Sequence, residues 1–297
     1  MRILFVTSNR IGDAVLSTGL LDHLLRTYPQ ARFTVACGPV AEGVFARMPN
    51  LERLITLEKR PYAGHWLPLW AATVGTWWDL VVDIRASALS WLVPTRRRAV
   101  MRRRPGHKTA QLAAILGLDP PPMPVTWTAP EDRALAERLI PPGPPVVALG
   151  PTANWTGKVW PPERFVELYR RIAAGPLPGA RVAVLAGPGP QERALAAPVL
   201  DALPGAIDLC GRLTLPEAAA CLARCALFAG NDSGLMHLAA AAGTPTLGLF
   251  GPTPAPEYAP AGRRTAVALA RGPDMADLPV EDALQAATGL IAVPQPA

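Results

Sequence analysis

The feature that most constrains the fold is a repeated alternation of short apolar runs with longer segments of helical period. The short runs are rich in leucine and β-branched residues, which predicts buried strands, and the segments between them carry apolar residues at helical spacing. Strands that alternate with helices form βαβ units on parallel sheets. Because the pattern occurs in both halves of the chain, we predict an α/β fold with two sheets.

The predicted elements fall into two groups. The first half holds predicted strands at Ile3–Thr7, Phe33–Cys37 and Leu80–Ile84, with a helix over about Asp13–Thr27. The second half holds predicted strands at Val146–Gly150, Val182–Ala186, Ile207–Cys210, Leu227–Gly230 and Thr246–Phe250. The helices between them are predicted at about Pro162–Ala174, Gln191–Leu203, Pro216–Arg224 and Leu235–Ala242.

The length of 297 residues suits two domains of typical size. We predict two Rossmann-like domains facing across a cleft, over residues 1–142 and 146–297. The stretch Pro141–Pro145 between them can neither continue a helix nor join a strand ladder. A linker is favoured over an ordinary surface loop because a new buried strand begins at Val146. A last helix, about Val280–Ile291, follows the second sheet and can fold back on the N-terminal domain.

Composition excludes several classes of protein. Hydrophobic residues make up 50% and charged residues 18%, which excludes disorder throughout the chain. The four cysteines lack the paired spacing of a zinc site, so we expect them to be buried small hydrophobes. No DxD-like carboxylate pair lies near Asp232, so we expect no metal to be bound. The N-terminal apolar run Ile3–Val6 is too short for a signal peptide, and Trp66–Trp78 is too short to span a bilayer. We therefore expect a cytoplasmic protein.

Ligands of open α/β sheets bind at the carboxyl ends of the strands, so the loops there hold the candidate residues. The loop after the first predicted strand contains Arg10, Gly12 and Asp13. Gly12 permits a tight turn or a close backbone approach. Asp13 has two interpretations: a general base that takes a proton from an acceptor hydroxyl, or a cap of the following helix.

A second candidate loop follows the strand at Val146–Gly150. Lys158 lies in this polar, glycine-containing loop, where its ammonium can neutralise a phosphate and Asn154 can add a hydrogen bond. The alternative is a solvated loop lysine. The spacing does not match the P-loop consensus, which argues against an ATPase.

The third and strongest candidate is the run Phe228–Ala241, in which a strand, a small polar turn and a helix follow one another. The helix is predicted to begin near Ser233 or Gly234, so its N-terminal N–H groups suit a diphosphate. Asp232 is anionic and better suited to accept sugar hydroxyls. His237 either bonds this loop or a phosphate, or is a packing residue. The turn after Phe250 completes a phosphate-sized pocket on the same edge of the sheet.

Four blocks in this order resemble the ADP-heptose heptosyltransferases of lipopolysaccharide core assembly. They cover roughly residues 1–255, which makes the resemblance more specific than any single motif. The blocks are Gly12-Asp13 with Tyr28-Pro29-Gln30-Ala31, Lys158-Val159-Trp160-Pro161, Asn231-Asp232-Ser233-Gly234-Leu235-Met236-His237, and Phe250-Gly251-Pro252-Thr253.

The resemblance implies a two-domain glycosyltransferase of the GT-B type, with an N-terminal acceptor-binding domain and a C-terminal nucleotide-sugar-binding domain. It implies inverting transfer of a heptose or related sugar from an ADP-sugar, without a metal or other cofactor. By this analogy Asp13 is the general base, Arg10 and Gly12 lie on the acceptor side, and Lys158 holds the diphosphate. The remaining donor-binding residues that it implies are Asn154, Glu192, Asp232, Ser233, Gly234 and His237.

A basic and aromatic band lies in the N-terminal half. Its basic part is Arg96–Arg98, Arg102, Arg103, Arg104, His107 and Lys108, and its aromatic part is Trp66, Trp70, Trp77, Trp78 and Trp91. Arginine binds phosphate and carboxylate, and tryptophan favours membrane interfaces. We predict that the band docks an anionic, lipid-linked glycan acceptor at the inner membrane. The alternative is a solvated charge run beside core tryptophans.

Three other functions compete with this interpretation. A nucleic-acid-binding protein is disfavoured because the positive charge is confined to one segment and no nucleic-acid motif is present. A nucleotide-sugar epimerase or hydrolase of the same fold would consume the donor without a lipid acceptor. A non-catalytic sugar-nucleotide binder is disfavoured because Asp13 and the donor loop are both present.

Overall fold

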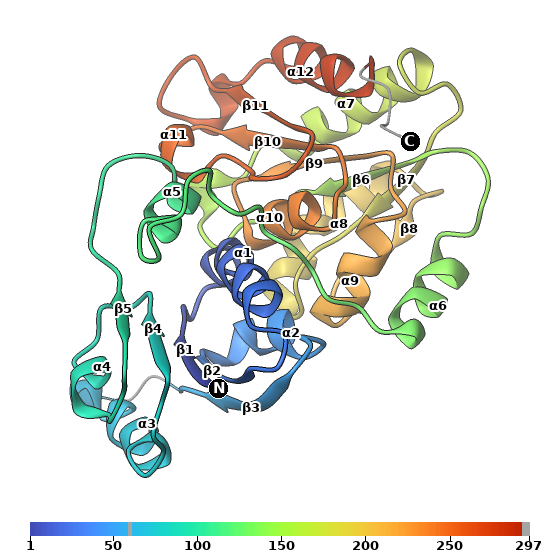
Figure 1. Cartoon of the computed structure of the whole chain (residues 1–297). Coiled ribbons are helices and arrows are strands. Elements are labelled where there is room, and N and C mark those ends of the chain that lie inside the picture. The colour runs from blue at the N-terminus through green and yellow to red at the C-terminus, as the bar shows by residue number, and fades with distance from the viewer. Residues whose placement is uncertain (59–60, 293–297) are drawn as a thin grey trace. The chain divides into compact units, whose positions relative to one another are not determined.

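The computed structural model describes residues 1–58 and 61–292 of the chain. The chain forms two compact units, Met1–Trp127 and Thr128–Ala297. Each unit is built on one parallel sheet with helices on both faces (Figure 1). The predicted α/β fold with two parallel sheets is confirmed.

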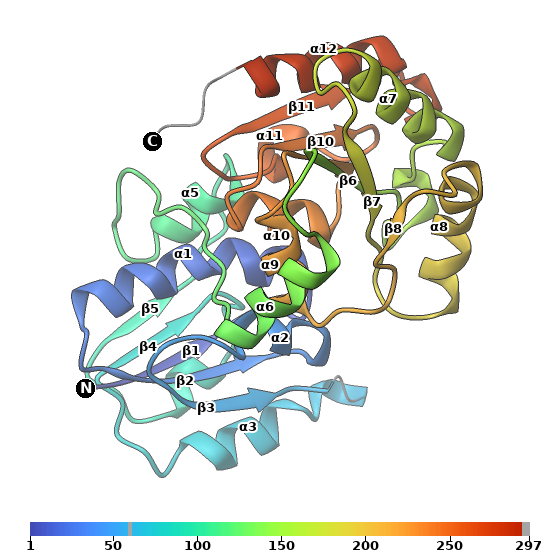
Figure 2. The same cartoon turned by 90° about the vertical axis from the view of Figure 1, so that its right-hand side faces the viewer.

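The first unit has five parallel strands in the order β3-β2-β1-β4-β5. The strands are β1 (Arg2–Val6), β2 (Arg32–Cys37), β3 (Leu51–Thr56), β4 (Leu80–Asp83) and β5 (Arg98–Val100). The helices are α1 (Ile11–Thr27), α2 (Glu42–Phe45), α3 (Trp66–Thr73), α4 (Leu89–Leu92) and α5 (Lys108–Ala113). Helices α3 and α4 lie together on one face of the sheet (Figure 1), and α1 and α5 lie on the other (Figure 2).

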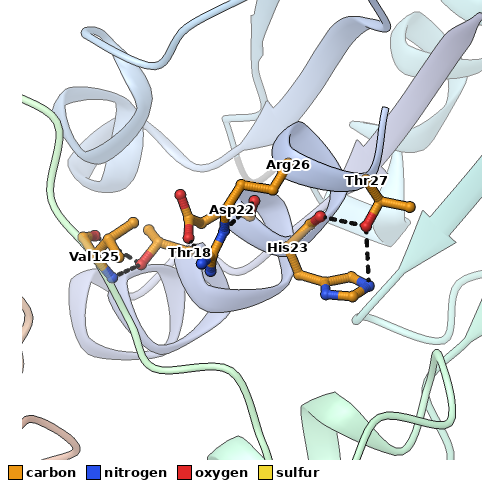
Figure 3. Close-up of polar contacts among 6 residues, drawn as sticks. All are labelled: Thr18, Asp22, His23, Arg26, Thr27 and Val125. Atoms are coloured by element: carbon orange, nitrogen blue, oxygen red, sulfur yellow. Dashed lines mark hydrogen bonds and ion pairs between the residues drawn. The ribbon is translucent and has the colours of Figure 1, made fainter. Parts of the chain in front are cut away.

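Helix α1 is the central helix of this unit and anchors the segment before the second unit. The Thr18 hydroxyl donates to the Val125 carbonyl at 2.8 Å and accepts from the Val125 N–H at 2.9 Å (Figure 3). A Cβ at Gly19 would lie 2.4 Å from the Pro122 carbonyl oxygen. Only glycine at this position leaves room for the backbone of the segment around Pro122 to pack on α1. An Asp22–Arg26 ion pair of 2.5 Å lies one turn further along α1.

The second unit has six parallel strands in the order β11-β10-β9-β6-β7-β8. The strands are β6 (Val146–Gly150), β7 (Arg181–Val184), β8 (Ile207–Asp208), β9 (Leu227–Asn231), β10 (Thr246–Phe250) and β11 (Thr265–Leu269). The helices are α6 (Pro130–Leu139), α7 (Pro162–Ala174), α8 (Pro190–Ala202), α9 (Leu215–Leu222), α10 (Gly234–Ala241), α11 (Ala255–Tyr258) and α12 (Val280–Ala292).

The main core of the second unit lies between its sheet and the helices α7, α8 and α12. Phe165, Leu168 and Ile172 of α7 and Ala283 and Ala287 of α12 are fully buried there. Helices α9 and α10 pack on the opposite face (Figure 2). The last helix therefore completes the fold of its own unit, where it contacts α7, β10 and β11.

The boundary between the units lies earlier than the predicted linker. It falls between Trp127 and Thr128, whereas Pro141–Pro145 belongs to the second unit. Helix α6 packs against α9, and the Arg224 Nε donates to the Ile140 carbonyl at 2.7 Å. These contacts bind α6 to the second unit, so the proline-rich stretch is a loop that joins α6 to β6.

The four cysteines are buried, as predicted. Burial raises the pKa of the Cys37 and Cys225 thiols to about 12, so both stay protonated near neutral pH. These thiols are inert packing residues.

Candidate functional site

In each sheet the direction of the strand order reverses at one point, called the switch point. The candidate residues of each unit lie in the loops near its own switch point. In the first unit β1 lies between β2 and β4, and in the second unit β6 lies between β7 and β9. Such a switch point leaves a crevice at the carboxyl ends of the two neighbouring strands, where ligands of open α/β sheets bind. The loops after β1 and β4 therefore define a candidate site in the first unit, and those after β6 and β9 define one in the second.

The second site is built around an ion pair between Lys158 and Asp232. Lys158 ends a short 3-10 helix, Thr156–Lys158, in the loop after β6, and Asp232 directly follows β9. The Lys158 Nζ lies 2.6 Å from the Asp232 Oδ2, and their side chains are 19% and 8% exposed. The interpretation of Lys158 as a solvated loop lysine is therefore wrong.

Asn231 and Trp160 join the same two loops below the ion pair. The Asn231 Oδ1 accepts a hydrogen bond from the Trp160 N–H at 3.1 Å, and both residues are fully buried. The Trp160 indole donates to the Leu278 carbonyl at 3.0 Å, which ties the Lys158 loop to the segment before α12. The loop that carries Lys158 is thus held on two sides.

A close approach of β6 and β9 forms the base of this site. Gly150 and Gly230 are paired in register at the carboxyl ends of the two strands. A Cβ on either glycine would lie 2.6 Å from the Cζ of Phe228, whose ring covers both. Only glycine leaves room for this ring beneath the loops.

Three buried polar atoms at the carboxyl ends of β9 and β10 have no hydrogen-bond partner within the part of the chain that the structure describes. They are Asn231 Nδ2, Ser233 Oγ and Thr253 Oγ1. All three come from the ends of β9 and β10 or the loops after them. Because buried polar groups are normally hydrogen-bonded, these atoms mark a place where a polar ligand can satisfy them.

The other predicted donor-side residues occupy different environments. Helix α10 begins at Gly234 with Ser233 as its N-cap, as predicted, and His237 is buried in its first turn. The Glu192 Oε2 accepts from the Gly187 N–H at 3.1 Å and holds the loop after β7. Asn154 is exposed, and the structure does not bring it to the ion pair by any contact among the described residues.

Asp13 lies in the first turn of α1 but does not cap the helix. The N-cap residue is Arg10, with no side-chain capping bond, and α1 begins at Ile11. The half-buried Asp13 carboxylate receives one hydrogen bond in the described part of the chain, from the Ser8 hydroxyl at 3.3 Å. The capping interpretation is therefore wrong, and the carboxylate remains available to a substrate.

The predicted acceptor-side residues lie around Asp13 and on the edge of the first sheet. Gly12 lies inside α1 with a helical backbone, so the expected loop turn at this residue is wrong: the helix begins earlier than predicted. Arg10 is exposed at the start of α1. Arg102, Arg103 and Arg104 are exposed in the loop after the edge strand β5.

The aromatic band divides into surface and core residues. Trp77 and Trp91 are 65% and 66% exposed, and Trp70 donates from its indole to the Leu92 carbonyl at 3.0 Å. Trp78 is a buried core residue, and the half-buried Trp66 packs against the same core cluster, so the alternative of core packing is correct for these two tryptophans. The Arg98 guanidinium lies 5.4 Å from the ring centroid of Trp91, a cation–π distance.

Sequence reasoning missed Asn231, Thr253 and a contact between Asn9 and Arg85 in the first unit. The Arg85 Nη1 donates to the Asn9 Oδ1 at 2.8 Å across the switch point between β1 and β4. A signal was available for each: a polar side chain at the end of a buried strand or within three residues of it. Residues 1–58 and 61–292 contain no cluster of three or more metal-ligating side chains, and no helix among them is long and apolar enough to cross a membrane.

Known proteins resemble this chain in sequence and in overall fold. The chain is 24% identical over 318 residues to lipooligosaccharide heptosyltransferase 2 of Haemophilus influenzae, covering 88% of this chain and 86% of that protein. The glycosyl transferase family 9 structure from Veillonella parvula matches with a TM-score of 0.82 and 20% identity over 98% of this chain and 97% of that one. Escherichia coli ADP-heptose lps heptosyltransferase II matches with a TM-score of 0.75 and 22% identity over 98% of each chain.

These findings define the chain as a glycosyltransferase with the fold of the GT-B type. The sequence pattern of glycosyltransferase family 9 (heptosyltransferase) matches residues 87–287. The chain belongs to this family, which confirms the resemblance seen in the four sequence blocks.

Proposed function

We propose that this chain transfers a heptose from ADP-heptose to a lipid-linked core glycan of lipopolysaccharide. The observation that carries the proposal is the Lys158–Asp232 ion pair at the switch point of the second sheet, beside the N-terminus of α10. A cation and a helix N-terminus together favour a diphosphate. The names of the Haemophilus and Escherichia relatives, which specify heptosyl transfer, support the choice of sugar and acceptor.

Asp13 is the proposed general base. Its carboxylate takes the proton of the acceptor hydroxyl as that oxygen attacks the anomeric carbon, while the bond from this carbon to the diphosphate breaks. The attack inverts the anomeric centre. The Ser8 hydroxyl orients the carboxylate through its hydrogen bond.

Lys158 is proposed to stabilise the charge that develops on the leaving ADP. An ammonium carries three N–H donors, so Lys158 can keep its bond to Asp232 and still donate two to phosphate oxygens. The N–H groups of the first turn of α10 add to this stabilisation. These groups supply charge stabilisation without a metal, and we propose metal-independent transfer with no cofactor.

The remaining donor-side residues are assigned by their places around the ion pair. Asp232 accepts sugar hydroxyls with the oxygen that Lys158 does not occupy, and the unpartnered Ser233 hydroxyl bonds the donor. Gly234 and His237 belong to the phosphate-binding turn of α10. Glu192 and Asn154 are instead assigned by the family resemblance alone, Glu192 to the nucleoside and the exposed Asn154 to the donor.

The acceptor side is proposed to be the first unit, working in the cytoplasm at the inner membrane surface. The exposed Trp77 and Trp91 and the exposed arginines 102–104 support this. Tryptophan favours the headgroup region, and arginine pairs with anionic lipid and with acidic sugars. Arg10 and Gly12 contribute the part of the acceptor side next to Asp13.

Titration calorimetry with ADP, UDP and GDP, followed by transfer from ADP-heptose, tests the function. We expect ADP to bind most tightly, and ADP to be released from ADP-heptose only when the lipid-linked acceptor is present. Preference for UDP or GDP would overturn the donor. Release of nucleotide without acceptor would favour the hydrolase or epimerase, and ADP binding without turnover would favour a non-catalytic binder.

A further inference from the structure

The switch point of the first sheet carries an arginine to which no role has been given. Arg85 lies two residues beyond β4, and its Nη1 donates to the Asn9 Oδ1 at 2.8 Å in the loop after β1. The two loops therefore meet across the crevice in which a sheet of this topology binds its ligand. Ser8, the neighbour of Asn9, donates to Asp13, so one loop contacts both the proposed base and Arg85.

The turn that carries Arg85 is built around the buried carboxylate of Asp83. This carboxylate accepts hydrogen bonds from the Arg85 N–H at 2.8 Å, the Ser87 N–H at 2.9 Å and the Ser87 hydroxyl at 2.6 Å. Ala86 adopts a left-handed backbone with φ 51°, which costs energy for a residue with a Cβ. Three hydrogen bonds to one carboxylate hold the turn in this conformation.

The side chain of Arg85 is held from two further directions. Its guanidinium lies 5.6 Å from the ring centroid of Trp66, the first residue of α3. Asn9 in turn lies against Gly38, where a Cβ would be 2.7 Å from the Asn9 Cβ. The cation–π contact and the hydrogen bond restrict the guanidinium before any ligand arrives, which lowers the entropic cost of binding.

Arg85 interacts electrostatically with the buried Asp83 carboxylate of its own turn, where burial raises the pKa of that carboxyl and the charge of Arg85 lowers it in part. Within the residues that the structure describes, no carboxylate lies within ion-pairing distance of this half-buried guanidinium. A guanidinium has five N–H donors, and Asn9 takes one. The free donors form the planar fork that binds the two oxygens of a carboxylate or a phosphate.

We propose that Arg85 is an anion-binding residue of the acceptor site, which holds a carboxylate or phosphate of the acceptor glycan beside Asp13. The inference deepens the proposed function and rests on it for the identity of the acceptor. Arg85 acts through the substrate it holds, and Asn9, Trp66 and Asp83 are its positioning residues.

The direct test is nuclear magnetic resonance of the Arg85 Nε–H group in the full-length protein. The resonance is assigned by its loss in Arg85→Gln and is followed while inorganic phosphate or acetate is added. We expect the chemical shift of this resonance to change saturably with one of the two anions. A response to phosphate would indicate a phosphate on the acceptor, and a response to acetate would indicate a carboxylate. No saturable shift with either anion would overturn the inference, whether or not the protein transfers heptose.

Kinetics supply the second test. Arg85→Gln should raise the KM for the acceptor by roughly tenfold to a hundredfold, because a charge-assisted hydrogen-bonded contact is lost. Its affinity for ADP should stay within twofold, and Arg85→Lys should restore the KM only in part because it lacks the planar fork. Arg138→Gln, the same change on the exposed face of α6, is the matched control.

The outcomes separate the two proposals. An unchanged acceptor KM in Arg85→Gln, or an equal rise in Arg138→Gln, would remove Arg85 from the acceptor site while leaving heptosyl transfer intact. A wild-type protein that transfers no heptose would overturn the proposed function, and the resonance titration would still decide whether Arg85 binds an anion.

Discussion

The ammonium of Lys158 and the carboxylate of Asp232 form an ion pair of 2.6 Å although the residues are 74 positions apart in the chain. Both side chains are largely buried, so each charge depends on the other for its stability. The pair joins the loops after β6 and β9 at the switch point of the second sheet.

Breaking this pair should destabilise the second unit. We expect Lys158→Met alone to lower the free energy of unfolding by roughly 1–3 kcal/mol, because it leaves the largely buried Asp232 carboxylate without its hydrogen-bond partner. Adding Asp232→Asn should recover part of the loss, and urea unfolding of the four proteins gives the coupling energy. The exposed Arg193–Asp208 pair is the matched control and should give a coupling below about 1 kcal/mol. Equal coupling energies in the two pairs would show that burial does not determine the strength of the Lys158–Asp232 interaction.

Replacing the proposed base should separate chemistry from donor binding. Asp13→Asn should lower kcat by roughly 10²–10⁴-fold, while the Kd for ADP changes by no more than a few-fold. Ser8→Ala, which removes only the hydrogen bond to the carboxylate, should have a smaller effect on kcat. Turnover close to wild type in Asp13→Asn would remove Asp13 from the role of base.

The glycine pair below the donor loops should not tolerate a methyl group. Gly150→Ala or Gly230→Ala brings a Cβ to 2.6 Å from the Phe228 ring, and we expect a loss of roughly 1–3 kcal/mol in unfolding free energy. Gly205→Ala is the control, because a Cβ there meets nothing within 4 Å. The loss of unfolding free energy caused by either alanine should be smaller when Phe228 is also changed to leucine. An equal loss with and without Phe228→Leu would argue against a clash with the ring.

Vesicle binding tests the exposed tryptophans and arginines of the first unit. Changing Arg102, Arg103 and Arg104 to alanine should weaken co-sedimentation with anionic vesicles by roughly a hundredfold, at about 1 kcal/mol per arginine. Trp91→Ser should also weaken it. Trp155→Ser, an exposed tryptophan of the second unit, is the control. Absence of binding by the wild-type protein, or binding unchanged in the arginine variant, would overturn the membrane proposal.

The central strands of both sheets could be predicted from the sequence, but three edge strands could not. The strands β1, β6 and β9 are fully or almost fully buried, so they read as continuous apolar runs. By contrast β3 contains Glu52 and Arg53, and β5 begins within the arginine run at Arg98. Both lie at edges of the sheet, where one side is open to water and the apolar pattern is lost. The edge strand β11 was not predicted either, although its sequence Thr265–Leu269 is largely apolar.

The site could be predicted loop by loop but not contact by contact. The rule that ligands lie after strand ends located Asp13, Lys158 and Asp232. It did not show that Lys158 pairs with Asp232 or that Arg85 pairs with Asn9, since each contact joins residues more than 70 positions apart. Such pairs depend on strand order, which one sequence without its relatives does not fix.

Helix α3 begins with Trp66, which makes a cation–π contact with Arg85, and four residues later carries Trp70 at the surface beside the exposed Leu67. One helix therefore touches both the proposed anion-binding arginine and the proposed lipid-facing surface. For an enzyme resting on a membrane through this helix, the acceptor arrives by lateral diffusion within the lipid layer. We expect the rate of heptosyl transfer to depend on the mole fraction of acceptor in the lipid layer. Adding inert lipid should therefore slow turnover even when the total amount of acceptor is constant.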